Sequence, residues 1–131
     1  MSVKVTPVEG MKLSAQYEGL VVVSGRVDEA TPPEGMSPGK LMAASLGLCT
    51  GMHVAGYLAR HGIHHGGFEV TVDQVNAENP RRCGAFTTTI RVKARLTETQ
   101  RKGLLEDADR CYVGNTLRSG AAIDVRLKDE P

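Results

Sequence analysis

Ser37–Gly62, SPGKLMAASLGLCTGMHVAGYLARHG, is the stretch of the chain that decides its fold. Ser37 is a good N-cap, Pro38 suits the first helical position and Gly62 suits a C-terminal stop, so we predict one long helix. Small side chains recur along it every four residues, at Ala43, Gly47, Gly51, Ala55 and Ala59. Such a stripe lets another backbone approach closely, either a sheet or a twin helix across a dimer axis.

The uncharged part of this stretch, Leu41–Ala59, is long enough to cross a bilayer. It is rich in Ala, Gly, Ser and Thr and contains His53, which is more typical of a buried helix in a soluble protein. The residues Met1–Gly10 lack the apolar run of a signal peptide. We therefore expect a cytoplasmic protein that does not bind a membrane.

Val-rich or alternating segments flank the helix and predict strands. Three short runs separated by Glu-Gly turns predict an antiparallel meander: Val3–Val8, Lys12–Tyr17 and Leu20–Arg26. After the helix, alternation predicts a hairpin of Phe68–Val75 and Ala85–Leu96, joined by the polar loop Asn76–Gly84.

The C-terminal part adds a second helix and a last strand. Thr97–Gln100 matches a capping box, which predicts a helix to about Arg110. Ala122–Lys128 alternates and predicts a strand with three aliphatic side chains inward: Ile123, Val125 and Leu127. The predicted order is βββ–α–ββ–α–β, an α+β protein with antiparallel sheet.

Size and composition restrict the class of protein. The chain has 131 residues, which is typical of one domain, and we predict a single domain over residues 1–131. A formal net charge of +1 and only 4% aromatic residues argue against nucleic acid as a partner. Three cysteines are too few for a disulfide framework and indicate free or redox-active thiols.

The three cysteines have different settings. Cys49 lies about three turns inside the long helix, too far for the helix dipole, so a thiolate there needs a cation from elsewhere. Cys111 ends the second predicted helix, where negative charge is disfavoured; this suits a resolving thiol better than a first nucleophile. Cys83 follows Arg81-Arg82 in a predicted loop without a pocket, so we interpret its reactivity as incidental. Each also has a structural interpretation, as a small buried side chain.

Histidines are a second set of candidates. His53 follows Cys49 by four residues, on the same helix face, and a Cys–His pair would share a proton. The interpretation we prefer is a core or interface histidine bonded to the backbone. Three further histidines surround one turn, and we interpret them as a solvated loop rather than a metal site: His61, His64 and His65. We expect no metal and no cofactor.

Two segments resemble the OsmC/Ohr family of osmotically inducible and organic hydroperoxide resistance proteins: Ser37–Gly51, SPGKLMAASLGLCTG, and Ala108–Leu117, ADRCYVGNTL. The family pattern joins a helix that begins at a Ser-Pro pair and leads to a first cysteine, here Cys49, with a second cysteine before an Asn-Thr-Leu run, here Cys111. The resemblance covers nearly the whole chain. It implies an intertwined homodimer in which the two central helices pack together.

The resemblance also implies a thiol peroxidase. Cys49 would attack the distal oxygen of an organic or hydrogen peroxide and become a sulfenic acid, and Cys111 would condense with it to a disulfide. An external dithiol, a lipoylated protein in some relatives, would reduce the pair.

The chain departs from the peroxidase members where the first cysteine is activated. Those members have a Glu ten residues before it, where this chain has Gly39, and an Arg in the first hairpin turn, where this chain has none. Lys12 and Arg26 are the candidate cations. A second hypothesis is therefore a small-molecule binding or redox-sensing module that kept the fold without robust peroxidase activity.

Overall fold

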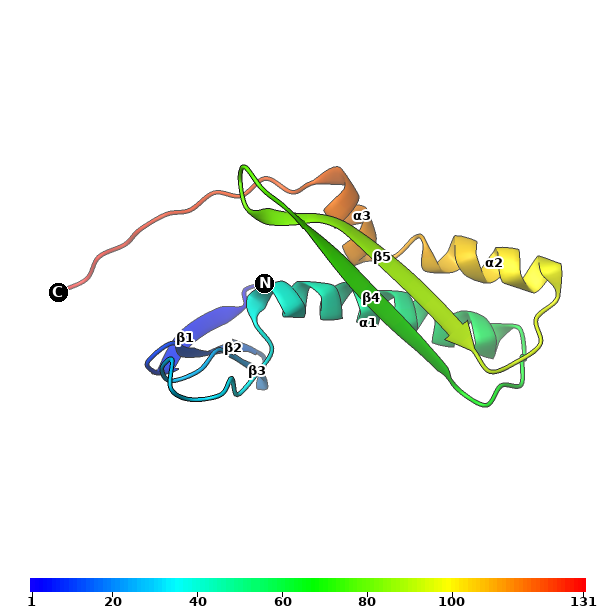
Figure 1. Ribbon diagram of the computed structural model, residues 1–131, viewed down its shortest axis with the longest axis horizontal. Coiled ribbons are helices and arrows are strands. Elements are labelled where there is room, and N and C mark those ends of the chain that lie inside the picture. The colour runs from blue at the N-terminus through cyan, green and yellow to red at the C-terminus, as the bar shows by residue number, and fades with distance from the viewer. The chain divides into compact units, whose positions relative to one another are not determined.

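The computed structural model describes all 131 residues, in the order β1–β2–β3–α1–β4–β5–α2–α3 (Figure 1). The strands and helices have these bounds: β1 Lys4–Glu9, β2 Lys12–Tyr17, β3 Leu20–Ser24, α1 Pro38–Arg60, β4 Phe68–Ala77, β5 Arg82–Val92, α2 Glu98–Ala108 and α3 Tyr112–Ser119. The predicted α+β class is confirmed. The chain forms two compact units, Met1–Ala44 with Asp73–Thr87, and Ser45–Val72 with Thr88–Pro131.

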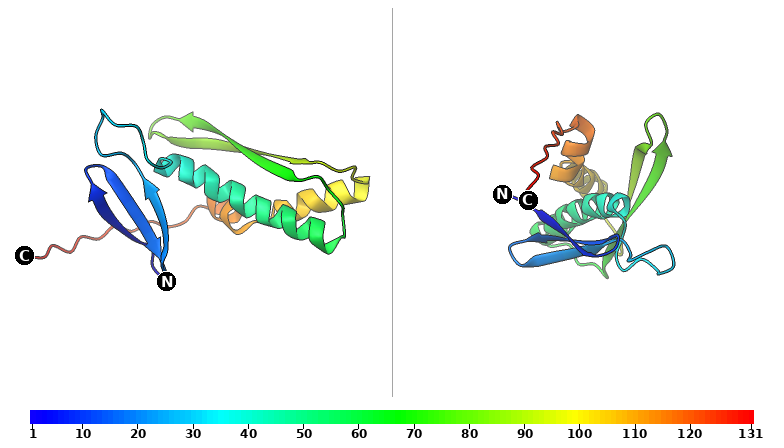
Figure 2. Two further views of the ribbon diagram at one scale, coloured as in Figure 1. Left: turned by 90° about the horizontal axis from the view of Figure 1, so that it is seen from below. Right: turned by 90° about the vertical axis from the view of Figure 1, so that its left-hand side faces the viewer.

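The first unit contains the predicted meander, which Figure 2 shows as one small sheet. β2 pairs antiparallel with β1 and with β3, and Ser14 is the only buried residue of the three strands. The turn between β1 and β2 requires glycine: Gly10 has φ +56°, and a Cβ there would lie 1.9 Å from the carbonyl oxygen of Val27.

Helix α1 begins and ends as its sequence predicts. Ser37 Oγ accepts a hydrogen bond from the backbone N–H of Lys40 at 3.3 Å, which caps the first turn. At the other end Gly62 has φ +58°, a conformation that stops the helix and that glycine adopts without strain. The capping residues therefore set both boundaries of the longest element.

The core of the second unit lies between α1, α2 and the hairpin. Val54, Tyr57 and Leu58 of α1 are buried against Leu104 and Ala108 of α2, and partly buried side chains of the hairpin complete the cluster: Phe68, Ile90 and Val92.

The small residues of α1 explain how closely the hairpin approaches. A Cβ at Gly47 would lie 3.1 Å from Val72 Cγ2, and one at Gly51 would lie 3.8 Å from Val70 Cγ2. This part of the stripe therefore packs against a sheet, one of the two predicted alternatives. Ala55 and Ala59 are exposed and do not share that role.

The turn of the hairpin is shorter than predicted, and the second strand ends at Val92 rather than at Leu96. β4 extends to Ala77 and β5 begins at Arg82, so Cys83 lies in a strand rather than in a loop. The Arg82 guanidinium donates to the carbonyls of Glu78 and Pro80, at 2.9 and 3.0 Å, and holds the turn together. The prediction failed because this end of the hairpin is mostly exposed and carries no apolar alternation.

The C-terminal prediction is confirmed in its first part and wrong in the rest. Thr97 and Gln100 form the predicted capping box of α2. The chain then makes an unpredicted helix, α3, and Ala122–Lys128 forms no strand but continues as the extended tail in Figure 1. The predicted inward side chains are 87%, 88% and 89% exposed: Ile123, Val125 and Leu127. A strand needs a neighbour for its backbone donors and acceptors, and this tail pairs with none in the single chain.

Candidate active site

Cys49 lies in the middle of α1 as a free, partly buried thiol. Thr50, beside it, is buried, whereas Leu48 and Met52 are 63% and 71% exposed. Cys49 therefore stands at the border between the packed side of α1 and an open apolar side. A thiol in that position is accessible to a small, uncharged substrate.

Cys111 is 2% exposed and is the N-cap of α3. Its Sγ accepts a hydrogen bond from the backbone N–H of Gly114 at 3.2 Å. The predicted setting, the negative end of the preceding helix, is therefore wrong: the sulfur faces the positive end of the following helix, which stabilises negative charge. The error arose because α3 was not predicted.

Helix α3 also brings Cys111 to the segment of α1 that holds Cys49. A Cβ on Gly114 would lie 3.0 Å from Cys111 Sγ and 3.7 Å from Leu46 Cδ1. Leu46 is about one helical turn before Cys49 on α1. The two predicted site cysteines, both free thiols, therefore belong to one packed region of the second unit.

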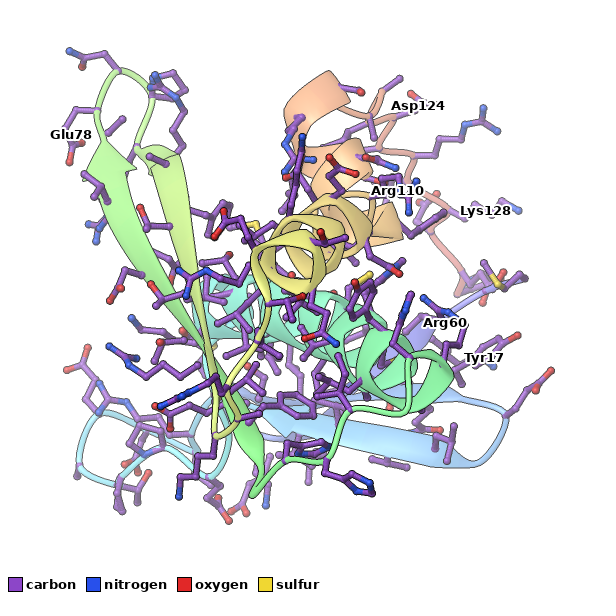
Figure 3. All side chains as sticks on the ribbon, turned by 90° about the vertical axis from the view of Figure 1, so that its right-hand side faces the viewer. Tyr17, Arg60, Glu78, Arg110, Asp124 and Lys128 are labelled. Atoms are coloured by element: carbon purple, nitrogen blue, oxygen red, sulfur yellow. The ribbon has the colours of Figure 1, made fainter.

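A cluster of charged side chains lies one turn after Cys49 on α1. His53 Nδ1 is 2.7 Å from Asp107 Oδ1, and the Arg60 guanidinium binds Asp107 Oδ2. The Asp107 side chain, on α2, is only 12% exposed. Figure 3 shows Arg60 near the end of α1 and Arg110 just beyond α2.

This cluster fixes the charge of Asp107. The hydrogen bond from His53, together with the positive charges of Arg60 and Arg110, lowers the pKa of Asp107 even though burial opposes ionisation. Asp107 is therefore a carboxylate that accepts hydrogen bonds from two sides.

The partner of His53 differs from the preferred sequence interpretation. We expected a bond to the backbone, and the structure shows a carboxylate 54 residues away in the chain. One sequence signal was available: Asp107 falls three residues after Leu104, on the apolar side of α2, where an acidic residue needs a partner.

The remaining candidates lie in the first unit. Lys12 Nζ forms an ion pair with Glu34 at 3.0 Å, and Arg26 is an exposed residue beyond the end of β3. Gly39 lies in the first turn of α1, and a Cβ there would meet no atom within 4 Å. The position at which the peroxidase members of the family carry Glu is thus sterically open.

Two of the histidines around the turn after α1 contact neighbouring residues. His61 stacks on the ring of Tyr57 with centroids 4.1 Å apart, and His65 Nδ1 accepts a hydrogen bond from the Gly67 N–H. No three ligand-type side chains of the chain are grouped to hold a metal ion.

The sequence model of a family described as OsmC-like protein matches residues 31–126. The chain therefore belongs to the OsmC-like family. The match includes both site cysteines and most of the extended tail. Helix α1 is long and apolar enough to span a bilayer, but a single such helix is weak evidence for a membrane protein.

Solved structures share the fold at low sequence identity. An osmotic stress induced and detoxification response protein from Psychrobacter arcticus has a TM-score of 0.76 and 24% identity, covering 88% of this chain and 87% of its own. An OsmC-like protein from Mycoplasma pneumoniae has a TM-score of 0.75 and 16% identity, covering 89% and 86%. An organic hydroperoxide resistance protein from Legionella pneumophila has a TM-score of 0.56 and 14% identity, covering 90% of each chain. No curated protein matches the chain in sequence.

Proposed function

We propose that this protein is a thiol-dependent peroxidase that reduces organic or hydrogen peroxides through Cys49 and Cys111. The observation that carries the proposal is the placement of two free thiols in the second unit: Cys49 is partly buried on α1, and Cys111 is buried at the start of α3, where Gly114 lies beside Leu46 of α1. Family membership supports peroxide chemistry, as does the name of the Legionella neighbour, a hydroperoxide resistance protein.

The reaction proceeds in three steps. The Cys49 thiolate attacks the distal oxygen of the peroxide, the O–O bond breaks, and the alkoxide leaves as an alcohol after taking a proton. Cys49 is now a sulfenic acid. The Cys111 thiolate attacks its sulfur, a disulfide forms, and hydroxide leaves as water after taking a proton. An external dithiol then exchanges with this disulfide, becomes oxidised and returns both cysteines to thiols.

The environments of the two cysteines suit this order of events. Cys49 borders an open surface and is the thiol that a peroxide reaches first, whereas Cys111 is buried. The hydrogen bond from the Gly114 N–H holds the Cys111 sulfur in a fixed position at the start of α3, which suits a resolving thiol.

We further propose that the working form is a homodimer. The open side of α1 carries apolar side chains at intervals of four, three and four residues: Leu48, Met52, Ala55 and Ala59. This is the spacing of a helix–helix seam, so a second copy of α1 is its natural occupant. Cys49 adjoins the seam, so the partner would form one border of the site.

The C-terminal tail supports the same assembly. Its alternating aliphatic side chains are exposed in the single chain: Ile123, Val125 and Leu127. Such a segment gains both backbone hydrogen bonds and apolar burial if it adds as a strand to another copy. A chain that exchanges this segment with its partner is an intertwined dimer.

Mass spectrometry after one equivalent of cumene hydroperoxide tests the chemistry. We expect a Cys49–Cys111 disulfide in the wild type and in Cys83→Ser, and a sulfenic acid on Cys49 in Cys111→Ser. A wild-type protein whose Cys49 stays reduced, or whose disulfide includes Cys83 instead, would overturn the proposed cycle. Stable oxidation of Cys49 without a disulfide would favour the redox-sensing alternative.

A further inference from the structure

We propose that His53, oriented by Asp107, is the proton acceptor and the positive charge that activate Cys49. This inference rests on the proposed role of Cys49 as the attacking thiol. It assigns an activating group in a chain where Gly39 stands at the family's Glu position and Lys12 is paired with Glu34.

His53 lies one helical turn after Cys49 on the same face of α1. Residues four apart on a helix are neighbours on one face, with Cβ atoms about 5–6 Å apart. Helical side chains lean toward the N-terminus of their helix, which for His53 is the side on which Cys49 lies. Both side chains are partly exposed, so neither is sealed from the other by the core.

The bond to Asp107 fixes which ring nitrogen is available. An ionised carboxylate only accepts hydrogen bonds, so Asp107 Oδ1 takes the proton on Nδ1 of His53. Nε2 then carries the lone pair of the neutral ring. It has no hydrogen-bond partner in the chain and is not buried. It is therefore free to accept the thiol proton of Cys49.

The charges around His53 suit an imidazolium. After the proton transfer, the ring is positive, with the Cys49 thiolate on one side and the Asp107 carboxylate on the other. Arg60 on α1 and Arg110, just after the end of α2, are the other charged groups around that carboxylate, and the second oxygen of Asp107 is bound by Arg60. This is the arrangement of a nucleophile, a base and an orienting acid, in which the acid acts only through the base.

The alternative role for the same contacts is a structural link between α1 and α2. His53→Asn separates the structural role from the proton-accepting role. The Asn side-chain amide replaces Nδ1 as a donor to Asp107 but offers no group that accepts a proton in place of Nε2. His61→Asn is the matched control, since His61 stacks on Tyr57 and belongs to no charged cluster.

The experiment measures alkylation of Cys49 by uncharged iodoacetamide as a function of pH. It uses the full chain with Cys83→Ser and Cys111→Ser, so that Cys49 is the only thiol. At pH 6.5 we expect His53→Asn to slow alkylation about tenfold, the effect of one pH unit in thiolate population, and Asp107→Asn to slow it about threefold. At pH 9.5, where ordinary thiols are ionised, the rates should converge.

Two results would overturn the inference. One is a His53→Asn rate at pH 6.5 equal to that of His61→Asn. The other is an equal slowing at both pH values, which is the result for a distorted helix. Neither result bears on peroxide reduction itself. If His53→Asn consumes peroxide at the wild-type rate, the proposed function stands. If alkylation of Cys49 depends on His53 but the wild type does not turn over peroxide, the proposed function is refuted and the role of His53 is not.

Discussion

The sulfur of Cys111 has a structural role as well as the proposed chemical one, because it caps α3 through the Gly114 N–H. Replacing an N-cap by alanine lowers the free energy of unfolding by about 1 kcal/mol, whereas serine retains an acceptor. We therefore expect urea unfolding to show Cys111→Ala as less stable than Cys111→Ser by about that amount. Alanine equal to or more stable than serine would show that the cap contributes nothing.

Asp107 makes the free energy of unfolding depend on pH, and its lowered pKa sets the direction of that dependence. Its pKa is lower in the folded protein than the ordinary value of 3.8, so the unfolded chain binds the proton more tightly. The stabilisation is therefore complete above pH 3.8 and is lost as pH falls through the lower, folded value. We expect the difference in free energy of unfolding between wild type and Asp107→Asn to be larger at pH 5 than at pH 3.

Asp109→Asn is the control for this titration. Asp109 also pairs with an arginine, Arg118, but both side chains are exposed, and exposed pairs contribute little. Its stability difference from wild type should be small at both pH values. A difference for Asp107→Asn that stays constant from pH 5 to pH 3 would contradict the assigned charge state.

At the scale of elements, the second half of α1 and α2 form the structural support of the site. Leu58 is 1% exposed within their shared core, and truncating such a side chain lowers the free energy of unfolding by about 2–5 kcal/mol. Leu58→Ala should therefore shift the urea midpoint strongly, whereas Leu105→Ala, on the exposed side of α2, should shift it little. Equal shifts would contradict the location of the core.

The elements that were predicted correctly from sequence are those with local boundary signals. Ser37, Gly62 and Thr97 mark the helix ends, and the meander is delimited by its Glu-Gly turns. Helix α3 was missed because it is only eight residues long and contains Gly114 and Asn115, which are weak helix formers. The tail has the right periodicity for a strand, but a strand requires a partner that periodicity does not supply.

The part of the site that was predictable from sequence is the part with local sequence signals. Cys49 and Cys111 are found from motifs along the chain, whereas the pairing of His53 with Asp107 depends on how α1 packs against α2. The cap on Cys111 depends on a helix that was not predicted. Local sequence thus identified the sulfur atoms, and tertiary packing determined their electrostatic environment.

At the scale of the whole molecule, the open face of α1 predicts the oligomeric state. Light scattering should give the wild type twice the chain mass of 14.0 kDa. Leu48→Glu combined with Met52→Glu should give monomer, because the charges would be buried in the seam. Leu105→Glu is the control, an exposed leucine on α2, and should remain dimeric. A monomeric wild type would refute the assembly.

Hydrogen exchange of the tail tests the strand exchange separately. Amides of residues 122–128 should be protected in the wild-type dimer and exchange freely in the monomeric double variant, because their bonds are made only to the partner. Free exchange in a protein that is dimeric by light scattering would place the tail outside the interface.

The central claim is that this assembly reduces peroxides through Cys49. The most direct measurement is the steady-state consumption of cumene hydroperoxide by the purified full chain with a dithiol reductant, beside Cys49→Ser and Cys83→Ser. The proposed function predicts repeated turnover in the wild type and in Cys83→Ser, and none above background in Cys49→Ser. A wild-type rate no greater than that of Cys49→Ser would contradict it.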